Sequence, residues 1–302
     1  MSQEIAQIIN EKKLTRKDFV SDQEVRWCPG CGDYAILNAV KKSLADRQAK
    51  KENTVFVSGI GCSSRLPYYM DTYGFHTIHG RAPAFATGIK LTNPELDVWI
   101  ITGDGDALSI GGNHFIHLLR RNLNCQILLF NNEIYGLTKG QASPASRTGT
   151  VSPSTPSGSL ESPMSACELA LSSGATFVAR GVDTAIKQLV PTLSKAQEHV
   201  GTSLVEIYQN CIVYNDDVFK SFTDKSVAID KQIHLENGKP MLFGENNTKG
   251  LSINKDYSSL EILDLEKNPE ELSKVLIHDY SNKTIASLLT QMDQNLMPVA
   301  LG

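Results

Sequence analysis

Two short motifs restrict the fold of this chain more than any other feature: Gly-Asp-Gly at 103–105 and Asn-Asn at 131–132, with 25 residues between them. An apolar, β-branched run at 96–101 predicts a buried strand that ends at the first motif, and 126–130 predicts a strand that ends at the second. Residues 111–121 predict a helix between them. Two parallel strands joined by a helix have their carboxyl ends at one edge of the sheet, so both motifs should meet where such folds bind ligands.

Together these motifs can form a site for magnesium and a diphosphate. The glycines beside Asp104 allow a phosphate to approach the backbone, and the carboxylate can face a hard cation together with an amide oxygen of Asn132. Either motif alone is an ordinary turn, but the pair at the ends of two hydrophobic strands favours binding. The spacing resembles the thiamine diphosphate motif. This resemblance implies that Asp104, Asn132 and the carbonyl of Ile134 bind Mg²⁺, with Gly103 and Gly105 against the cofactor.

Cysteine supplies the second pattern. Cys28 and Cys31 form a CxxC loop before a helix expected to begin near Asp33, and paired thiolates at this spacing suit a metal or an iron-sulfur cluster. Cys62 and Cys211 each follow an apolar strand, so they too should lie in loops at the ends of elements. The remaining two cysteines, Cys125 in a predicted strand and Cys167 in a predicted helix, are expected to be packing residues.

Several kinds of site compete for the CxxC loop. A thioredoxin-like redox pair is disfavoured because the motif does not follow a first βα unit. A disulfide framework is disfavoured because no secretory segment is seen. Structural zinc and a [4Fe-4S] cluster both remain open, since spacing alone does not distinguish iron from zinc. The neighbouring cofactor motif favours the cluster.

A cluster beside thiamine diphosphate leads to a family resemblance. The chain resembles the β subunit of 2-oxoacid:ferredoxin oxidoreductases, most closely the 2-oxoglutarate type. The likeness runs from about 24 to 216 and extends more faintly to the C-terminus. The matching strings are WCPGCG (27–32), GIGCSSR (59–65), HTIHGRAPAFATGIK (76–90), GDGDALSIGGNHFIHLLRRN (103–122), NNEIYGLTKGQ (131–141) and GATFVARG (174–181).

The resemblance implies roles for further residues. It places the cluster ligands at Cys28, Cys31, Cys62 and Cys211, and it places His79 and Gly80 near the cofactor. Other residues with expected roles follow two of the strands. Ser63, Ser64 and Arg65 are candidates for binding phosphate or a substrate carboxylate, with a surface arginine as the alternative. Leu137 is expected to support the cofactor ring. Thr138 and Lys139 are candidates for contacts with diphosphate, substrate or coenzyme A, with a solvated lysine as the alternative.

The pattern along the chain predicts one α/β domain with appendages. Apolar strands near 54–58, 97–102, 126–130, 175–179 and 203–209 alternate with helices, which is typical of a doubly wound parallel sheet. We therefore expect an N-terminal arm at 1–22, a thiamine diphosphate-binding and iron-sulfur domain at 23–216, and a C-terminal extension at 217–302 that packs on a partner subunit. Residues 142–163 are rich in Ser, Pro, Thr and Gly, and predict either a linker or a flap over the site.

Composition excludes some classes of function. The net charge of −4 gives no electrostatic reason for binding nucleic acid or a membrane surface. No apolar run reaches the roughly 18 residues of a membrane span. Free thiols without a signal-like segment predict a cytoplasmic protein.

The expected reaction follows from the two cofactors. Thiamine diphosphate attacks the ketone carbon of a 2-oxoacid and accepts the electrons of decarboxylation, and a nearby cluster passes them singly to ferredoxin. Coenzyme A then takes the acyl group, which gives succinyl-CoA from 2-oxoglutarate. Alternatives are pyruvate or branched-chain 2-oxoacids as substrates, a non-redox thiamine diphosphate decarboxylase or synthase, and a non-catalytic subunit. No Glu can be assigned to the cofactor's aminopyrimidine, so an α subunit is expected to supply it and the chain alone should be inactive.

Overall fold

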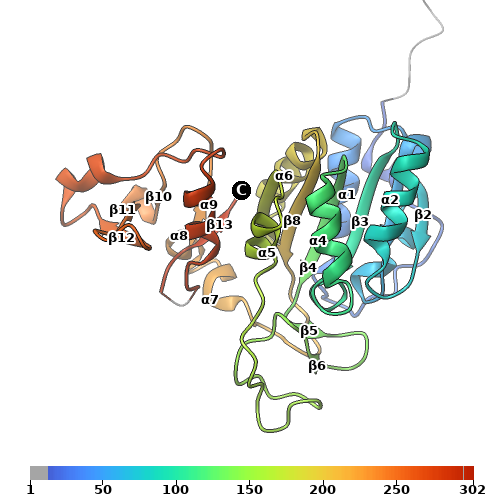
Figure 1. Ribbon diagram of the computed structural model, residues 1–302, viewed down its shortest axis with the longest axis horizontal. Helices are drawn as coiled ribbons and strands as arrows, with labels where there is room; N and C mark the ends of the chain where they lie inside the picture. The colour runs from blue at the N-terminus through green and yellow to red at the C-terminus, as the bar shows by residue number, and fades with distance from the viewer. Residues whose placement is uncertain (1–12, 295) are drawn as a thin grey trace, which may run out of the picture.

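A six-stranded parallel sheet forms the centre of the molecule (Figure 1). The structure is a computed structural model that describes residues 13–294 and 296–302. The strand order is β2-β1-β3-β4-β8-β7, and every pair in this sheet is parallel. This confirms the predicted doubly wound α/β fold. The strands are β1 (Thr54–Ser58), β2 (Tyr73–His76), β3 (Asp97–Gly103), β4 (Cys125–Asn131), β7 (Phe177–Val182) and β8 (Thr202–Tyr208).

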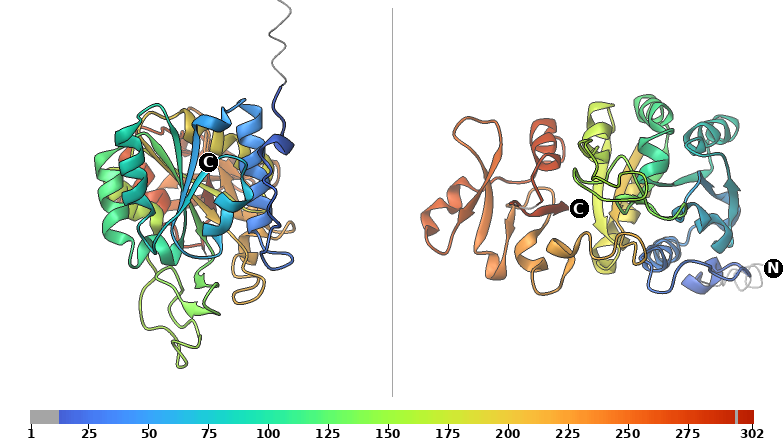
Figure 2. Two further views of the ribbon diagram at one scale, coloured as in Figure 1. Left: turned by 90° about the vertical axis from the view of Figure 1, so that its right-hand side faces the viewer. Right: turned by 90° about the horizontal axis from the view of Figure 1, so that it is seen from below.

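Helices cover both faces of the sheet, giving three layers (Figure 2). Because side chains alternate along a strand, β3 sends Trp99 and Ile101 into one core and Val98 and Ile100 into the other. The first core also receives α1 (Asp33–Asp46) and α6 (Ile186–Glu198). The second receives α2 (Ala82–Thr92), α4 (Gly112–Arg121) and α5 (Ala166–Ser172).

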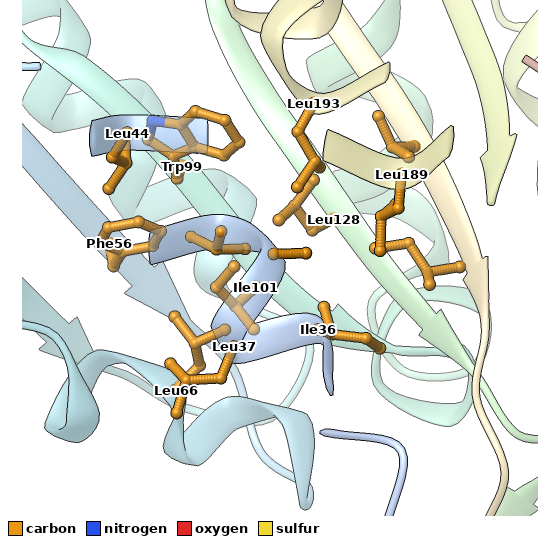
Figure 3. Packing of buried hydrophobic residues seen from close by; sticks show 14 of the residues in the cluster. Ile36, Leu37, Leu44, Phe56, Leu66, Trp99, Ile101, Leu128, Leu189 and Leu193 are labelled. Atoms are coloured by element: carbon orange, nitrogen blue, oxygen red, sulfur yellow. The ribbon is translucent and has the colours of Figure 1, made fainter. Parts of the chain in front are cut away.

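The core under α1 and α6 contains the largest buried side chains (Figure 3). Trp99 and Phe56 are fully buried there, with their rings stacked 5.9 Å apart between centroids. Burying one such side chain stabilises the fold by roughly 1.5–3 kcal/mol. This packing holds β1 and β3 side by side, so it also fixes the two loops that leave their carboxyl ends.

Three elements differ from the sequence prediction. The edge strand β2 was not predicted, because all four of its residues are exposed and show no buried pattern. Strand β7 runs to 182 rather than 179, since Gly181 and Val182 continue the pairing with β8. The Gly-Asp-Gly motif does not end in a turn. Gly103 is the last extended residue, and Asp104 begins the short helix α3 (Asp104–Leu108).

The loops at the carboxyl end of the sheet contain short elements of their own. They are η4 (Ser63–Tyr69) after β1, and β5 (Ile134–Tyr135) paired with β6 (Gln141–Ala142) after β4. The segment 143–165 then projects beyond the sheet before α5 begins (Figure 1). Its first residues are buried, among them Ser143 and Ser146. The first residues of this segment therefore pack against the main domain.

A separate C-terminal lobe lies beyond β7 (Figure 1). It has its own hydrophobic core around Ile233, Phe243 and Leu251. Gly302 exchanges two backbone hydrogen bonds with Arg180 of β7, at 3.1 and 3.3 Å. The predicted boundary at 216 falls between β8 and this lobe. The lobe contains α7 (Lys220–Thr223), α8 (Ala228–Lys231), β9 (Gln232–His234), β10 (Leu242–Phe243), η5 (Glu245–Asn247), β11 (Lys249–Ile253), β12 (Leu260–Asp264), η6 (Pro269–Lys274), α9 (Lys283–Thr290) and β13 (Val299–Leu301).

The N-terminal arm was predicted at 1–22, and residues 1–12 of it lie outside the described residues. The helix η2 (Arg16–Phe19) follows, and Phe19 is completely buried in the core under α1. Val20 pairs with Met70 in an isolated bridge. Residues 13–22 thus pack on their own chain, and a contact of the arm with a partner stays a prediction. A short helix η3 (Lys51–Asn53) precedes β1.

Candidate active site at the carboxyl end of the sheet

One cavity opens at the carboxyl ends of β1, β3, β4 and β8. It lies between the loops that contain the two motifs, and it also reaches the first cysteine loop. Three aspartates are part of its wall, and all three are buried. The lining residues are Asp33, Ile60, Gly61, Cys62, Ser63, His79, Gly103, Asp104, Gly105, Asp106, Phe130, Asn132, Ile134, Tyr135, Gly136, Leu137, Thr138 and Gln209.

Asp104 is a buried carboxylate at the start of α3. Ser143 donates a hydrogen bond to its Oδ2 atom at 2.5 Å. Burial raises the pKa of Asp104 to about 7, although the Ser143 hydroxyl and the Gly105 amide lower it. A divalent cation beside this carboxylate would stabilise its charged form. The predicted Mg²⁺ therefore fits the position.

The loop after β4 turns sharply around Glu133, which has a left-handed φ of 55°. The amide Nδ2 of Asn132 donates to Gln209 at 2.8 Å, and its Oδ1 accepts from the amide of Ile134 at 3.2 Å. Because Nδ2 is already held by Gln209, Oδ1 is the amide atom that remains for a metal. Asn132 and Ile134 both line the cavity with Asp104. The three predicted Mg²⁺ ligands are thus brought to one site.

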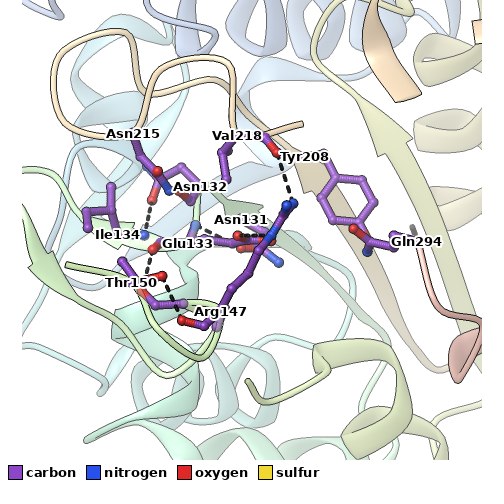
Figure 4. Close-up of polar contacts among 12 residues, drawn as sticks. Asn131, Asn132, Glu133, Ile134, Arg147, Thr150, Tyr208, Asn215, Val218 and Gln294 are labelled. Atoms are coloured by element: carbon purple, nitrogen blue, oxygen red, sulfur yellow. Dashed lines mark hydrogen bonds and ion pairs between the residues drawn. The ribbon is translucent and has the colours of Figure 1, made fainter. Parts of the chain in front are cut away.

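Side chains from distant segments hold this loop in place (Figure 4). Arg147 forms an ion pair with Glu133 at 2.9 Å and donates to the carbonyl of Val218, also at 2.9 Å. Ser146 donates to the carbonyl of Glu133 at 2.5 Å, and Asn215 donates to the carbonyl of Asn132 at 2.8 Å. The loop that contains the predicted metal ligand is therefore tied to the projecting segment and to the chain that leads into the C-terminal lobe.

A second connection to the lobe lies beneath the same loop. Asn131 donates to Glu206 at 2.9 Å, and Glu206 accepts from Arg180 at 2.8 Å. On the same strand, Tyr208 receives a hydrogen bond from Gln294 of the lobe at 2.8 Å (Figure 4). The side chains of Arg180 and Glu206 are largely shielded from solvent, so the two residues form a mostly buried ion pair. It fixes β7 and β8 under the cavity.

Burial separates two of the six cysteines from the other four. Cys125 and Cys167 are buried within β4 and α5, as packing residues are. The Sγ atoms of Cys211 and Cys62 lie 3.4 and 3.7 Å from the position that a Cβ on Gly136 would take. All six thiols are free. Gly136 therefore leaves open the space in which these two thiols meet.

The other two candidate ligands, Cys28 and Cys31, interact electrostatically with this pair. Burial raises the pKa of Cys62 to about 12, and Asp33, Cys211 and Cys28 add to the shift. Burial likewise raises the pKa of Cys31, again with contributions from Cys62 and Cys211. Since thiolates here need a compensating positive charge, a metal cluster fits this group of thiols. Among the described residues, no three His, Cys, Asp or Glu side chains lie close enough to hold a single metal ion.

The structure separates the remaining predicted residues into two groups. Ser63, His79, Leu137 and Thr138 line the cavity, and the buried hydroxyl of Ser63 has no hydrogen-bond partner within the described chain. By contrast, Ser64, Arg65, Gly80 and Lys139 are not part of the lining. Arg65 donates to the carbonyl of Arg26 at 3.3 Å, and Gly80 donates to Asp106. Roles for all eight stay predictions.

Sequence reasoning missed several residues of the site. A second aspartate, Asp106, follows Asp104 by two positions, and this spacing in the sequence could have indicated a second buried carboxylate. Asp33 directly follows the CxxC loop, and burial raises its pKa to about 7. Tyr135 donates to the carbonyl of Gly105 at 3.1 Å and so joins the two motif loops. For Arg147, in a segment of low complexity, the sequence offered no signal.

Comparison with known proteins gives consistent matches. Residues 59–207 match the thiamine pyrophosphate enzyme, C-terminal TPP binding domain. The 2-oxoglutarate oxidoreductase subunit KorB of Mycobacterium tuberculosis is 50% identical over 289 residues, which cover 95% of this chain and 76% of that protein. The 2-oxoglutarate synthase subunit KorB of Methanocaldococcus jannaschii is 39% identical over 261 residues, which cover 83% of this chain and 92% of the relative.

A solved structure matches nearly the whole chain. It is a 2-oxoglutarate:ferredoxin oxidoreductase from Magnetococcus marinus with 2-oxoglutarate, coenzyme A and succinyl-CoA bound. The TM-score is 0.76 at 33% identity, and the match covers 97% of this chain and 85% of that chain. Within the described residues, none of the helices is both long and apolar enough to cross a bilayer. With its parallel sheet and its paired motifs at one cavity, the chain belongs to the β subunits of the 2-oxoacid:ferredoxin oxidoreductases, a class of enzymes, and carries their thiamine diphosphate-binding domain.

Proposed function

We propose that this chain is the β subunit of an enzyme that oxidatively decarboxylates 2-oxoglutarate. With coenzyme A and ferredoxin the products are succinyl-CoA, CO₂ and reduced ferredoxin. The choice of 2-oxoglutarate is supported by the names of the relatives and by the ligands bound in the Magnetococcus marinus structure. The single observation that carries the proposal is the cavity where the Asp104 and Asn132 loops meet beside Cys62.

Magnesium and diphosphate fit the residues at one side of this cavity. Asp104, Asn132 and the carbonyl of Ile134 would hold Mg²⁺, with Gly103 and Gly105 leaving the backbone open to the diphosphate. The Ser63 hydroxyl, which has no hydrogen-bond partner among the described residues, is available to an anionic oxygen. Leu137 is 45% exposed and lines the cavity, so it can offer an apolar surface to the cofactor ring. When bound, thiamine diphosphate supplies a carbanion and an electron sink for decarboxylation.

A [4Fe-4S] cluster fits the thiols on the other side. Cys28, Cys31, Cys62 and Cys211 would be its ligands, and Gln209 donates a hydrogen bond to the Cys31 sulfur at 3.4 Å. Cys62 lines the cofactor cavity, and its sulfur and that of Cys211 both lie close to Gly136. A cluster there would lie next to the cofactor and could take its electrons one at a time, whereas zinc has no redox chemistry.

A partner subunit is needed to complete this site. The acids that line the cavity are Asp33, Asp104 and Asp106, and no glutamate is among the lining residues of the described chain. The carboxylate that serves the aminopyrimidine would therefore come from an α subunit, which would also supply much of the coenzyme A site. Roles for Arg65 and Lys139 in binding substrate or coenzyme A belong to this proposal.

The test uses the chain purified anaerobically together with its α subunit. We expect about four irons and four acid-labile sulfides per β chain. We also expect ferredoxin reduction that depends on 2-oxoglutarate and coenzyme A and exceeds the rate with pyruvate or branched-chain 2-oxoacids. Stoichiometric zinc without sulfide would contradict the redox reaction and favour a non-redox thiamine diphosphate enzyme. Activity of the β chain alone would contradict the need for the α subunit.

A further inference from the structure

Asp106 is the most heavily hydrogen-bonded side chain at the cavity. Its Oδ1 atom accepts from the amide of Gly80 at 2.7 Å and from the amide of Ile60 at 3.1 Å. Its Oδ2 atom accepts from the hydroxyl of Thr102 at 2.6 Å. Only 3% of the residue is exposed. One carboxylate thus joins the end of β1, the end of β3 and the turn before α2.

A fourth contact connects this carboxylate to His79. The Nδ1 atom of His79 lies 2.6 Å from Oδ1 of Asp106. Since two amides and a hydroxyl already donate to the carboxylate, it acts as an acceptor throughout, and Nδ1 must be the donor. Nε2 is then the ring nitrogen that remains for a ligand, and His79 lines the cavity. In the neutral ring Nε2 accepts a hydrogen bond, and in the protonated ring it donates one.

The space around Asp106 supports a fixed position for this carboxylate. A Cβ on Gly59 would lie 2.0 Å from its Oδ2 atom, and a Cβ on Gly111 would lie 2.3 Å from its carbonyl oxygen. Glycines on both sides therefore allow the backbone to close around the residue. The His79 side chain is less enclosed, since 36% of it is exposed. Its ring is hydrogen-bonded to Asp106. The histidine consequently depends on Asp106 for its orientation.

We propose that Asp106 is a positioning residue, which fixes His79 with the proton on Nδ1 so that Nε2 contacts an anionic oxygen of the bound ligand. The nature of the ligand in this inference rests on the proposed function. The geometry of the Asp106–His79 pair is independent of it. The anionic oxygen belongs either to the diphosphate of the cofactor or to the carboxylate of the 2-oxoacid. An outer residue that orients a ligand-binding histidine typically contributes about 10- to 100-fold in affinity.

The first test determines which ring nitrogen of His79 carries the proton, in the full-length chain without cofactor. Selective ¹⁵N labelling of histidine gives the imidazole nitrogen shifts, and the His79→Gln variant identifies the His79 signals. We expect a protonated Nδ1 in the wild type and its loss in Asp106→Ala, which removes both acceptor oxygens. Thr102→Val removes a different donor to Asp106 and should lower stability without changing the His79 signals. A wild-type ring with its proton on Nε2 alone would overturn the proposal, and this readout needs only the His79→Gln variant to fold, for the assignment.

The second test asks whether Asp106 acts through His79. Titration of the complex with the α subunit, using Mg²⁺ and thiamine diphosphate, should give about 10-fold weaker binding in Asp106→Ala and in His79→Gln, with no further loss in the double variant. Full addition of the two losses would overturn the proposal. If cofactor affinity is unchanged but KM for the 2-oxoacid rises in the complex with the α subunit, the contact is to the substrate carboxylate. If wild type binds no thiamine diphosphate, the proposed function fails while the proton position still stands.

Discussion

The loops after β3 and β4 line the same cavity, but they are held in different ways. The first contains Asp104 and is fixed mainly by its neighbours in the sheet, through the contacts of Asp106 with Ile60, Gly80 and Thr102. The second contains Asn132 and is fixed by side chains from outside the sheet. Arg147 and Ser146 come from the projecting segment, and Asn215 comes from the chain leading to the C-terminal lobe.

This difference indicates that the two halves of the predicted metal site depend on different parts of the structure. The backbone at Asp104 should keep its geometry as long as the sheet is folded, and only the carboxylate has a contact with the projecting segment, through Ser143. The half at Asn132 should also depend on the appended segments, because their side chains set the left-handed turn at Glu133. Changes in those segments can therefore alter cofactor affinity without touching a metal ligand.

The largest effect is expected where the two loops meet. In Gly105→Ala the new Cβ would lie 2.2 Å from the ring of Tyr135, whose hydroxyl donates to Gly105. The ring must shift, so both loops should move and overpacking should cost about 1–3 kcal/mol of folding stability. We expect affinity for Mg²⁺ and thiamine diphosphate to fall about 100-fold. Titration of the complex with the α subunit measures this, with Gly112→Ala as the control because open space surrounds that position. Equal affinity in both variants would contradict the contact.

A smaller effect is expected from the outer support of the second loop. Arg147→Met removes the ion pair with Glu133 and the bond to Val218 but keeps most of the apolar stem. We expect cofactor affinity about 10-fold weaker, together with little change in the sheet. Arg120→Met is the matched control, since Arg120 is exposed at the end of α4 and the whole of β4 separates it from the loop. If Arg147→Met binds the cofactor like the control, the loop does not depend on the appended segments.

The second loop also borders the thiols of Cys62 and Cys211 at Gly136. A substitution there tests whether this loop also leaves room for the cluster. A Cβ in Gly136→Ala meets the Cys211 and Cys62 sulfurs at ordinary contact distances, so the chain should fold. The added atom occupies space that a cluster would need, and we expect loss of most of the bound iron and sulfide. The control is Gly88→Ala on α2, which meets no atom within 4 Å. Full iron content in Gly136→Ala would place the cluster elsewhere.

The smallest effect on the site is expected from a change in the core away from both loops. Burial, with a smaller contribution from Arg16, lowers the pKa of Lys41 on α1 to about 8 from the ordinary 10.5. The unfolded chain therefore binds more protons between these values, so stability should rise with pH from about 8 to about 10.5. Below pH 8 the full cost is present, at about 2–3 kcal/mol.

Lys41→Met should accordingly be more stable than the wild type at about pH 7, and the difference should shrink towards about pH 10. Denaturant unfolding at both pH values measures it. Cofactor affinity at pH 7 should be unchanged, which separates effects on stability from effects on the two loops. A difference that stays constant with pH would mean that Lys41 does not titrate in this range.

Much of the fold was predictable because its strands are buried on both faces. The apolar runs at 54–58, 97–102 and 126–130 predicted β1, β3 and β4 to within one residue at each end, and the doubly wound fold followed from alternation with helices. The exposed strand β2 was missed because it has no buried face to leave a pattern. The helix at Asp104 was missed because Gly-Asp-Gly is typical of a turn.

The amino-acid sequence by itself determined the family, the two motif loops and the residues proposed to bind metal and cluster, because these depend on residue type and on spacing along the chain. Only the tertiary structure decided which side chains support them. Asp106 meets His79 across 27 residues, Arg147 meets Val218 across 71, and Asn215 meets Asn132 across 83. Such contacts are set by the packing of whole elements, so no local pattern in the sequence records them.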